Sequence, residues 1–130
     1  MTQKIEWLSL PLVLAIHDEQ LVAHGGSGGV RDIALLESAL NRPLNKRNYE
    51  NAELPELAAA YAYGIGRNHP FVDGNKRTSL LALYTFLGIN GVDFIVAEAD
   101  AAAIILSLAS GEVSEESLAR WIRDNWPKVE

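Results

Sequence analysis

An uncharged stretch, residues 78–89, limits most strongly what this chain can fold into. Apolar side chains lie on every side of a helix drawn through it, and they include Leu80, Leu81, Ala82, Leu83, Tyr84, Phe86 and Leu87. A helix that is apolar around its whole circumference has to be enclosed by the rest of the fold. The stretch is also shorter than the roughly 20 residues that span a bilayer. We therefore predict a buried helix over residues 75–88 at the centre of the fold, and no membrane partner.

Helical patterns cover most of the remaining chain. Capping residues, apolar spacing and stop signals predict further helices over residues 9–24, 32–40, 55–68, 98–109 and 114–126. The 130 residues contain no internal repeat and no interdomain linker, and they fit one domain with a sizeable core. The predicted fold is therefore a single all-α domain over residues 1–130, with about six helices.

Residues 42–53 do not follow a helical period. Pro43 is expected to end the preceding helix, and the segment that follows mixes asparagines with Lys46, Arg47 and Tyr49. An unstructured stretch of this length in a small domain is usually a functional loop or disorder. We predict a loop here, with an ordinary mobile loop and a functional one both left open.

Charge is unevenly distributed along this acidic chain, whose formal net charge is −6. Residues 42–77 carry a net charge of +2, whereas residues 1–41 carry −3 and residues 90–130 carry −5. One short basic stretch favours a local anion site over a nucleic-acid surface, so no direct nucleic-acid partner is expected. The chain has no cysteine and its first residues contain no apolar export segment. Both observations suit a cytoplasmic protein.

The basic stretch ends in a polar turn, His69-Pro70-Phe71-Val72-Asp73-Gly74-Asn75-Lys76-Arg77, between two apolar helical segments. Pro70 disfavours helical geometry at the residue before it, so the first helix is expected to end near residue 68. Gly74 permits backbone angles that side chains forbid. The next helix would open with free backbone N–H groups that attract phosphate. Lys76 and Arg77 in its first turn would add full positive charges.

The other polar residues of this turn suit phosphate chemistry. Asp73 supplies a hard oxygen ligand of the kind that Mg²⁺ prefers, with phosphates and waters completing the shell. His69 can accept a proton from an attacking hydroxyl. Taken singly, each residue has an ordinary explanation: a loop histidine, a helix cap or a solvated basic pair. Each such explanation accounts for only one of these residues, whereas the turn contains all of them together.

Two features outside the turn have structural interpretations. The glycine-rich residues 25–29 lack the strand before and the helix after that a nucleotide-binding loop requires, so we interpret them as a flexible connection at the rim of a groove. His17 is expected to pack or hydrogen-bond inside the fold, and His24 to suit the end of its helix.

The nine-residue turn resembles the signature of the Fic/Doc superfamily, in the variant found in death-on-curing toxins. The likeness extends to the Arg31-Asp32 helix start, to Asn90-Gly91 and to residues 110–114. It implies a Fic-like fold, a catalytic base at His69 and a metal ligand at Asp73. It further implies that phosphates are bound by Gly74, Asn75, Lys76, Arg77 and Arg67.

Two positions depart from the broader Fic pattern. Lys76 stands where Fic nucleotide transferases have a glycine, and Leu80 where they have a second arginine. A lysine at that position would crowd the phosphate site, and leucine removes one contact to the triphosphate. In the Doc branch this implies reversed ATP and phosphoryl transfer instead of AMP transfer.

By the same resemblance, the cofactors are ATP and Mg²⁺ and the substrate is a protein, expected to be a translation elongation factor. A cognate antitoxin, with a segment that folds into a groove of the toxin, is the expected inhibitor, and residues 42–53 would form a target-binding flap. Two alternatives are kept: a Fic-type AMP transferase, and a catalytically silent binding or co-repressor module. Nucleotide orientation, target and oligomeric state are left open.

Overall fold

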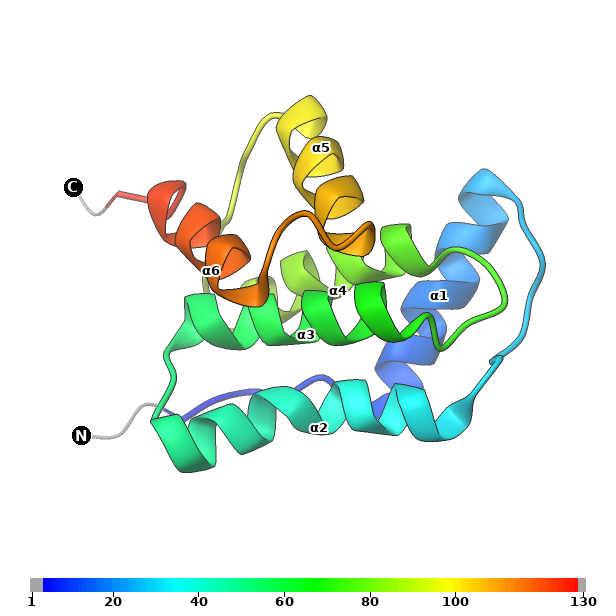
Figure 1. Cartoon of the computed structure of the whole chain (residues 1–130), viewed down its shortest axis with the longest axis horizontal. Coiled ribbons are helices and arrows are strands. Elements are labelled where there is room, and N and C mark those ends of the chain that lie inside the picture. The colour runs from blue at the N-terminus through cyan, green and yellow to red at the C-terminus, as the bar shows by residue number, and fades with distance from the viewer. Residues whose placement is uncertain (1–3, 129–130) are drawn as a thin grey trace.

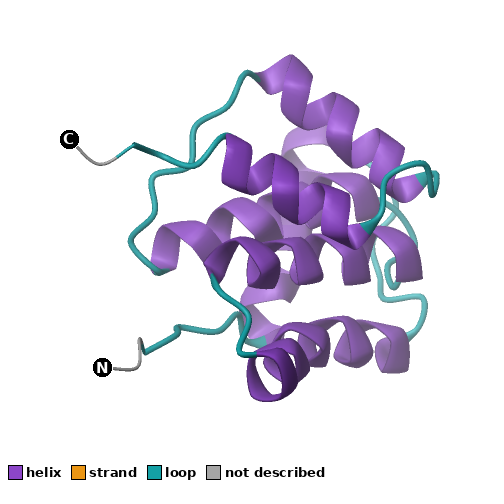
Figure 2. Ribbon diagram, turned by 60° about the vertical axis from the view of Figure 1, so that its left-hand side comes forward, coloured by secondary structure: helices purple, strands orange, loops and turns teal. Residues whose placement is uncertain are grey.

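The computed structural model describes residues 4–128, and six helices make up most of that range (Figure 1). They are α1 (Leu10–His24), α2 (Ile33–Glu50), α3 (Leu54–Asn68), α4 (Asn75–Ile89), α5 (Glu98–Ala109) and α6 (Glu115–Asp124). The described chain contains no strand, and its one β-bridge joins Val30 to Phe71 (Figure 2). The predicted all-α class is therefore confirmed. No helix within residues 4–128 combines the length and the apolar character that crossing a bilayer requires.

The predicted helix starts agree with the observed caps at three places. The side chains of Ser9, Asp32 and Ser114 each accept a hydrogen bond from a backbone N–H in the first turn of the helix that follows. Pro55 lies in the first turn of α3, where its missing N–H leaves no helical bond unmade. Local capping chemistry thus determines where α1, α2, α3 and α6 begin.

The most enclosed element is α3, in which eleven of fifteen residues are buried. It packs against α2, α4, α5 and α6. Small residues permit this close packing: a methyl group added at Gly64 would lie 2.9 Å from the Cα atom of Ala39 in α2. The buried hydroxyl of Tyr61 accepts a hydrogen bond from the Leu8 N–H (3.0 Å), and burial raises the pKa of Tyr61 to about 12.

Helix α4 packs on α1, α3 and α5, but only one of its faces is enclosed. Phe86, Leu87 and Leu83 are fully buried, whereas Leu81 and Ile89 remain 37% and 42% exposed. The prediction that α4 is buried on every side is therefore wrong for its outer face. That face forms part of a groove with α5.

The structure also corrects the predicted end of α2. This helix continues through Pro43 to Glu50, so most of residues 42–53 is helical and does not form a flap. Arg42 and Lys46, one turn apart on α2, both pair with the buried carboxylate of Glu115 in α6. That partner lies about seventy residues away in sequence, where local pattern reading could not find it.

Candidate active site

The polar turn forms the loop between α3 and α4, which we call the motif loop (residues 69–74). At the right-hand end of Figure 1 it lies beside α1 and the α1–α2 linker. Helix α3 ends where His69 adopts left-handed backbone angles (φ 49°, ψ 56°). Gly74, also left-handed (φ 78°), stands at the N-cap of α4. The chain therefore reverses between two adjacent helices within six residues.

The start of α4 has no side-chain cap. Its first hydrogen bond runs from the Thr78 N–H to the Gly74 carbonyl (2.9 Å). The backbone N–H groups of Asn75, Lys76 and Arg77 donate to no acceptor in residues 4–128. Three unpaired donors at the positive end of a helix dipole are suited to bind an anion, so the start of α4 is a candidate anion site.

The two cations expected beside this site, Lys76 and Arg77, lie in the first turn of α4. Lys76 and Arg77 are exposed, and neither forms an ion pair with any other residue in the described range. Positive side chains in a first turn oppose the helix dipole, so the arrangement is unfavourable until an anion occupies it. The site has the electrostatics of a phosphate-binding turn.

A pocket of about 410 Å³ opens over this turn. It is lined by His69, Val72, Asp73, Gly74, Asn75, Lys76 and Arg77. All predicted site residues except Arg67 therefore meet in one space, whose size falls within the range of small-molecule pockets. The imidazole of His69 is exposed at its edge and makes no hydrogen bond to residues 4–128.

Asp73 is exposed, and both of its carboxylate oxygens face backbone donors. Oδ1 accepts from the Gly74 N–H (2.8 Å) and Oδ2 from the Ser27 N–H (3.3 Å). No group of three His, Cys, Asp or Glu side chains in the described chain could hold a metal alone. One carboxylate beside an open phosphate site nevertheless fits Mg²⁺, which takes most of its remaining ligands from phosphates and water.

Asn75 contributes to the pocket differently from its neighbours. Its side chain is buried, accepts from the Phe71 N–H and donates to the Phe71 carbonyl, both at 3.0 Å. These two hydrogen bonds use the amide group to stabilise the motif loop. A phosphate would therefore meet the backbone N–H of Asn75, and not its side chain.

Arg67 lies outside the pocket. Its guanidinium donates to the Ala109 carbonyl at the end of α5 (3.3 Å) and packs against Gly111. In this arrangement Arg67 caps α5. A phosphate contact would require the side chain to leave that carbonyl.

Helix α1 supports the motif loop from beneath. His17 is buried, stacks on Phe71 with ring centroids 3.8 Å apart, and its Nε2 lies 2.8 Å from the Asp73 carbonyl oxygen. The prediction that His17 packs inside the fold is confirmed. Gln20, one turn later, is buried against Gly74, and neither polar atom of its side chain has a partner in the described range.

The glycine segment, residues 25–29, lies against the loop and is more than a connection. A methyl group added at Gly26 would lie 2.9 Å from Asp73 Oδ2, and Gly26 and Gly29 both have positive φ angles. The next residues pair with the motif loop, because the Val72 N–H donates to the Gly29 carbonyl (3.1 Å). Sequence reading missed these contacts, although the density of glycines was a signal of close approach.

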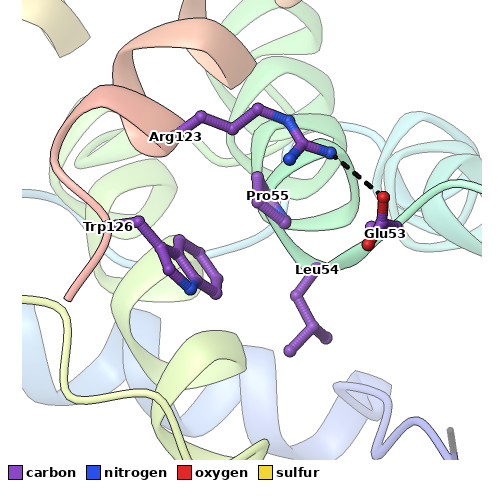
Figure 3. A pocket seen from close by; sticks show the side chains of 5 residues that line it. All are labelled: Glu53, Leu54, Pro55, Arg123 and Trp126. Atoms are coloured by element: carbon purple, nitrogen blue, oxygen red, sulfur yellow. Dashed lines mark ion pairs between the residues drawn. The ribbon is translucent and has the colours of Figure 1, made fainter. Parts of the chain in front are cut away.

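A second pocket, of about 340 Å³, lies between the start of α3 and the end of α6 (Figure 3). Its charged groups already neutralise one another, since Arg123 pairs with Glu53 at 3.5 Å and binds Glu56 through two hydrogen bonds. This leaves the pocket over the motif loop as the better candidate for chemistry.

Known proteins resemble this chain over most of its length. The model of the Fic/DOC family matches residues 7–87, which include the motif loop. "Protein kinase doc" of Escherichia phage P1 is 33% identical over 112 residues, which cover 85% of this chain and 88% of that protein. "Toxin Doc" of Mycolicibacterium smegmatis is 47% identical over 74 residues, which cover 55% of this chain and 56% of that relative.

Proposed function

This chain belongs to the Fic/DOC family, and from that premise we propose that it transfers a phosphoryl group from ATP to a Ser or Thr hydroxyl of a protein. One observation carries the proposal. The same pocket joins the free imidazole of His69 to the three unpaired amides at the start of α4. A proton acceptor beside a phosphate site is the minimum that such a transfer needs.

In the proposed reaction, His69 accepts the proton of the target hydroxyl as its oxygen attacks the γ-phosphorus of ATP. The bond between that phosphorus and the oxygen shared with the β-phosphate breaks, and ADP leaves with the bonding electron pair. The open amides of residues 75–77, with Lys76 and Arg77, stabilise the charge that develops on the phosphates. Asp73 would hold Mg²⁺, which would neutralise negative charge on the phosphate oxygens.

Two residues favour phosphoryl transfer over AMP transfer. Lys76 stands in the first turn of α4, where its ammonium group competes for space close to the bound phosphates. Leu80 contributes an apolar side chain to the neighbouring groove, so the second arginine of the broader Fic pattern is missing there. The name "Protein kinase doc" of the phage relative points the same way.

The target and the inhibitor follow from the resemblance to Doc toxins. The target is a translation elongation factor, and its modification in the cytoplasm arrests growth. The inhibitor is an antitoxin whose apolar segment occupies the groove between α4 and α5, of about 600 Å³. The groove is lined by Leu80, Leu81, Tyr84, Ile105 and Leu106, and it ends at Lys76 and Arg77. A carboxylate of the antitoxin would meet those two cations.

The test uses ATP labelled at either the γ- or the α-phosphate, with purified protein and a cell extract. We expect γ-label on one protein target, and a loss of about 10²- to 10⁴-fold in its rate for His69→Ala. Label from the α-phosphate would instead identify an AMP transferase. No transfer of either label, together with growth arrest that His69→Ala leaves intact, would identify a binding module.

A further inference from the structure

Three consecutive backbone carbonyls at the end of α3 point to one short segment. The guanidinium of Arg31 donates from Nη2 to the Asn68 carbonyl (2.8 Å) and from Nε to the His69 carbonyl (2.7 Å). The Pro70 carbonyl accepts from the backbone N–H groups of Arg31 (2.7 Å) and Asp32 (3.1 Å). The Arg31 side chain therefore contacts both peptide groups that flank His69, and the backbone of residues 31 and 32 holds the peptide group after Pro70.

The residue held in this way has an unfavourable backbone. His69 is one of two non-glycine residues with positive φ in the described chain. Left-handed geometry is unfavourable for an L-residue, and it persists where surrounding contacts determine it. The other such residue is Asn51, at the end of α2, and both asparagine and histidine are among the types found most often in this conformation. His69 differs from Asn51 in that it is the proposed catalytic base.

Arg31 is not engaged elsewhere. It is exposed, and it forms no ion pair with a carboxylate in residues 4–128. A positive charge at the C-terminal end of α3 is favoured by the helix dipole. The planar guanidinium can donate to two neighbouring carbonyls at once, which the single ammonium group of lysine cannot do with the same geometry.

These contacts determine where the imidazole points. The His69 N–H donates to the Ile65 carbonyl (3.2 Å), and the carbonyls of Asn68 and His69 both accept from Arg31. These backbone contacts, and not the His69 side chain, which has no hydrogen bond in the described structure, set the direction of its Cα–Cβ bond. We propose that Arg31 is a positioning residue, which fixes the left-handed conformation of His69 and so aims the base into the pocket. The inference rests on the proposed function, since it assigns His69 that role.

The kinetic test compares Arg31→Ala and Arg31→Lys with Arg123→Ala. Arg123 is a matched control, because it is an exposed arginine that makes two hydrogen bonds to Glu56 at the opposite end of α3. Figure 3 shows its ion pair with Glu53 at the same end. We expect kcat for phosphoryl transfer to fall about 10- to 100-fold in both Arg31 variants, with the KM for ATP changed less than about threefold. Guanidinium at non-denaturing concentration should restore part of the rate of Arg31→Ala and none of Arg31→Lys. Arg123→Ala should retain the wild-type kcat.

A second measurement does not depend on activity. The backbone φ of His69, obtained from NMR couplings and carbon shifts, should leave the left-handed region in both Arg31 variants and stay there in Arg123→Ala. An unchanged φ at His69 in folded Arg31 variants would overturn the inference, as would an unchanged kcat. If the wild-type protein transfers no phosphoryl group, the proposed function fails, and the NMR result alone decides whether Arg31 holds His69.

Discussion

Gly74 shows how much the site depends on a single missing side chain. Its φ of 78° is unfavourable for other residues, and a methyl group added there would overlap Nε2 of Gln20. Gln20 is buried, so it has little room to move aside. The turn that opens the candidate anion site therefore requires glycine for both its backbone angle and its contact with α1.

A pair of glycine substitutions at the two ends of α4 tests this dependence. Gly74→Ala should destabilise the fold by at least about 2 kcal/mol, from left-handed strain and the contact with Gln20. Gly88→Ala, near the other end of α4, meets nothing within 4 Å and should stabilise by about 0.5–1 kcal/mol. Urea denaturation gives both values.

Adding Gln20→Ala separates the two causes of the Gly74 effect. If the contact with Gln20 matters, the double variant should be more stable than the sum of the two single effects predicts. Strict additivity would leave the backbone angle as the only cause.

At the scale of single residues, the sequence predicted most members of the candidate site, but it did not predict what two of their side chains contact. His69, Asp73, Gly74, Lys76 and Arg77 were all expected in one site, and all line one pocket. Their proximity could be predicted because they are neighbours in the chain. The use of the Asn75 amide by Phe71, and of Arg67 by the Ala109 carbonyl, depends on side-chain directions that residue types do not specify.

At the scale of elements, α2 depends on a distant partner. Lys46 lies 3.1 Å from Glu115 Oε2, and Arg42 donates from Nε to Glu115 Oε1 at 2.7 Å. Arg42 also lies over the ring of Tyr63, 4.7 Å from its centroid. These contacts join α2 to α6 and to α3, which explains why the helix continues through Pro43. Local signals predicted the starts of helices well and this end poorly, because tertiary contacts outweigh propensity.

Neutralising Glu115 tests this connection. Glu115→Gln should lower the free energy of unfolding by about 1–3 kcal/mol, because Arg42 and Lys46 would lose the buried carboxylate with which they pair. Glu116→Gln, at the exposed neighbouring position, should change it by less than about 0.5 kcal/mol. Thermal and urea denaturation followed by circular dichroism would measure both. Equal effects would show that the Glu115 contacts do not hold α2 and α6 together.

At the scale of the whole molecule, the groove between α4 and α5 distinguishes this fold from a fully packed bundle. Its walls keep apolar side chains in contact with solvent, including Leu81 and Leu106 at 37% and 58% exposure. From the sequence, all apolar residues of α4 were assigned to the core. Apolar character alone does not distinguish a helix face that packs inside the fold from one that is exposed and can bind a partner.

An acidic substitution in this groove tests the proposed antitoxin site. Leu106→Glu should keep growth arrest but escape neutralisation by the co-expressed antitoxin, since it places a charge in an apolar contact and does not line the pocket over the motif loop. Ile95→Glu is the matched control, because Ile95 is 74% exposed and does not line the groove. Neutralisation of Leu106→Glu as efficient as that of wild type would exclude this groove as the docking site.

Lys76 and Arg77 line both the pocket over the motif loop and the groove. A ligand in the pocket and a ligand in the groove would both contact these two charges. Binding of one would therefore change the affinity for the other. Linkage is reciprocal: the factor by which a bound peptide changes nucleotide affinity is the factor by which nucleotide changes peptide affinity. With ATP and the proposed antitoxin as the two ligands, the ATP concentration in the cell would help to set how tightly the antitoxin is held.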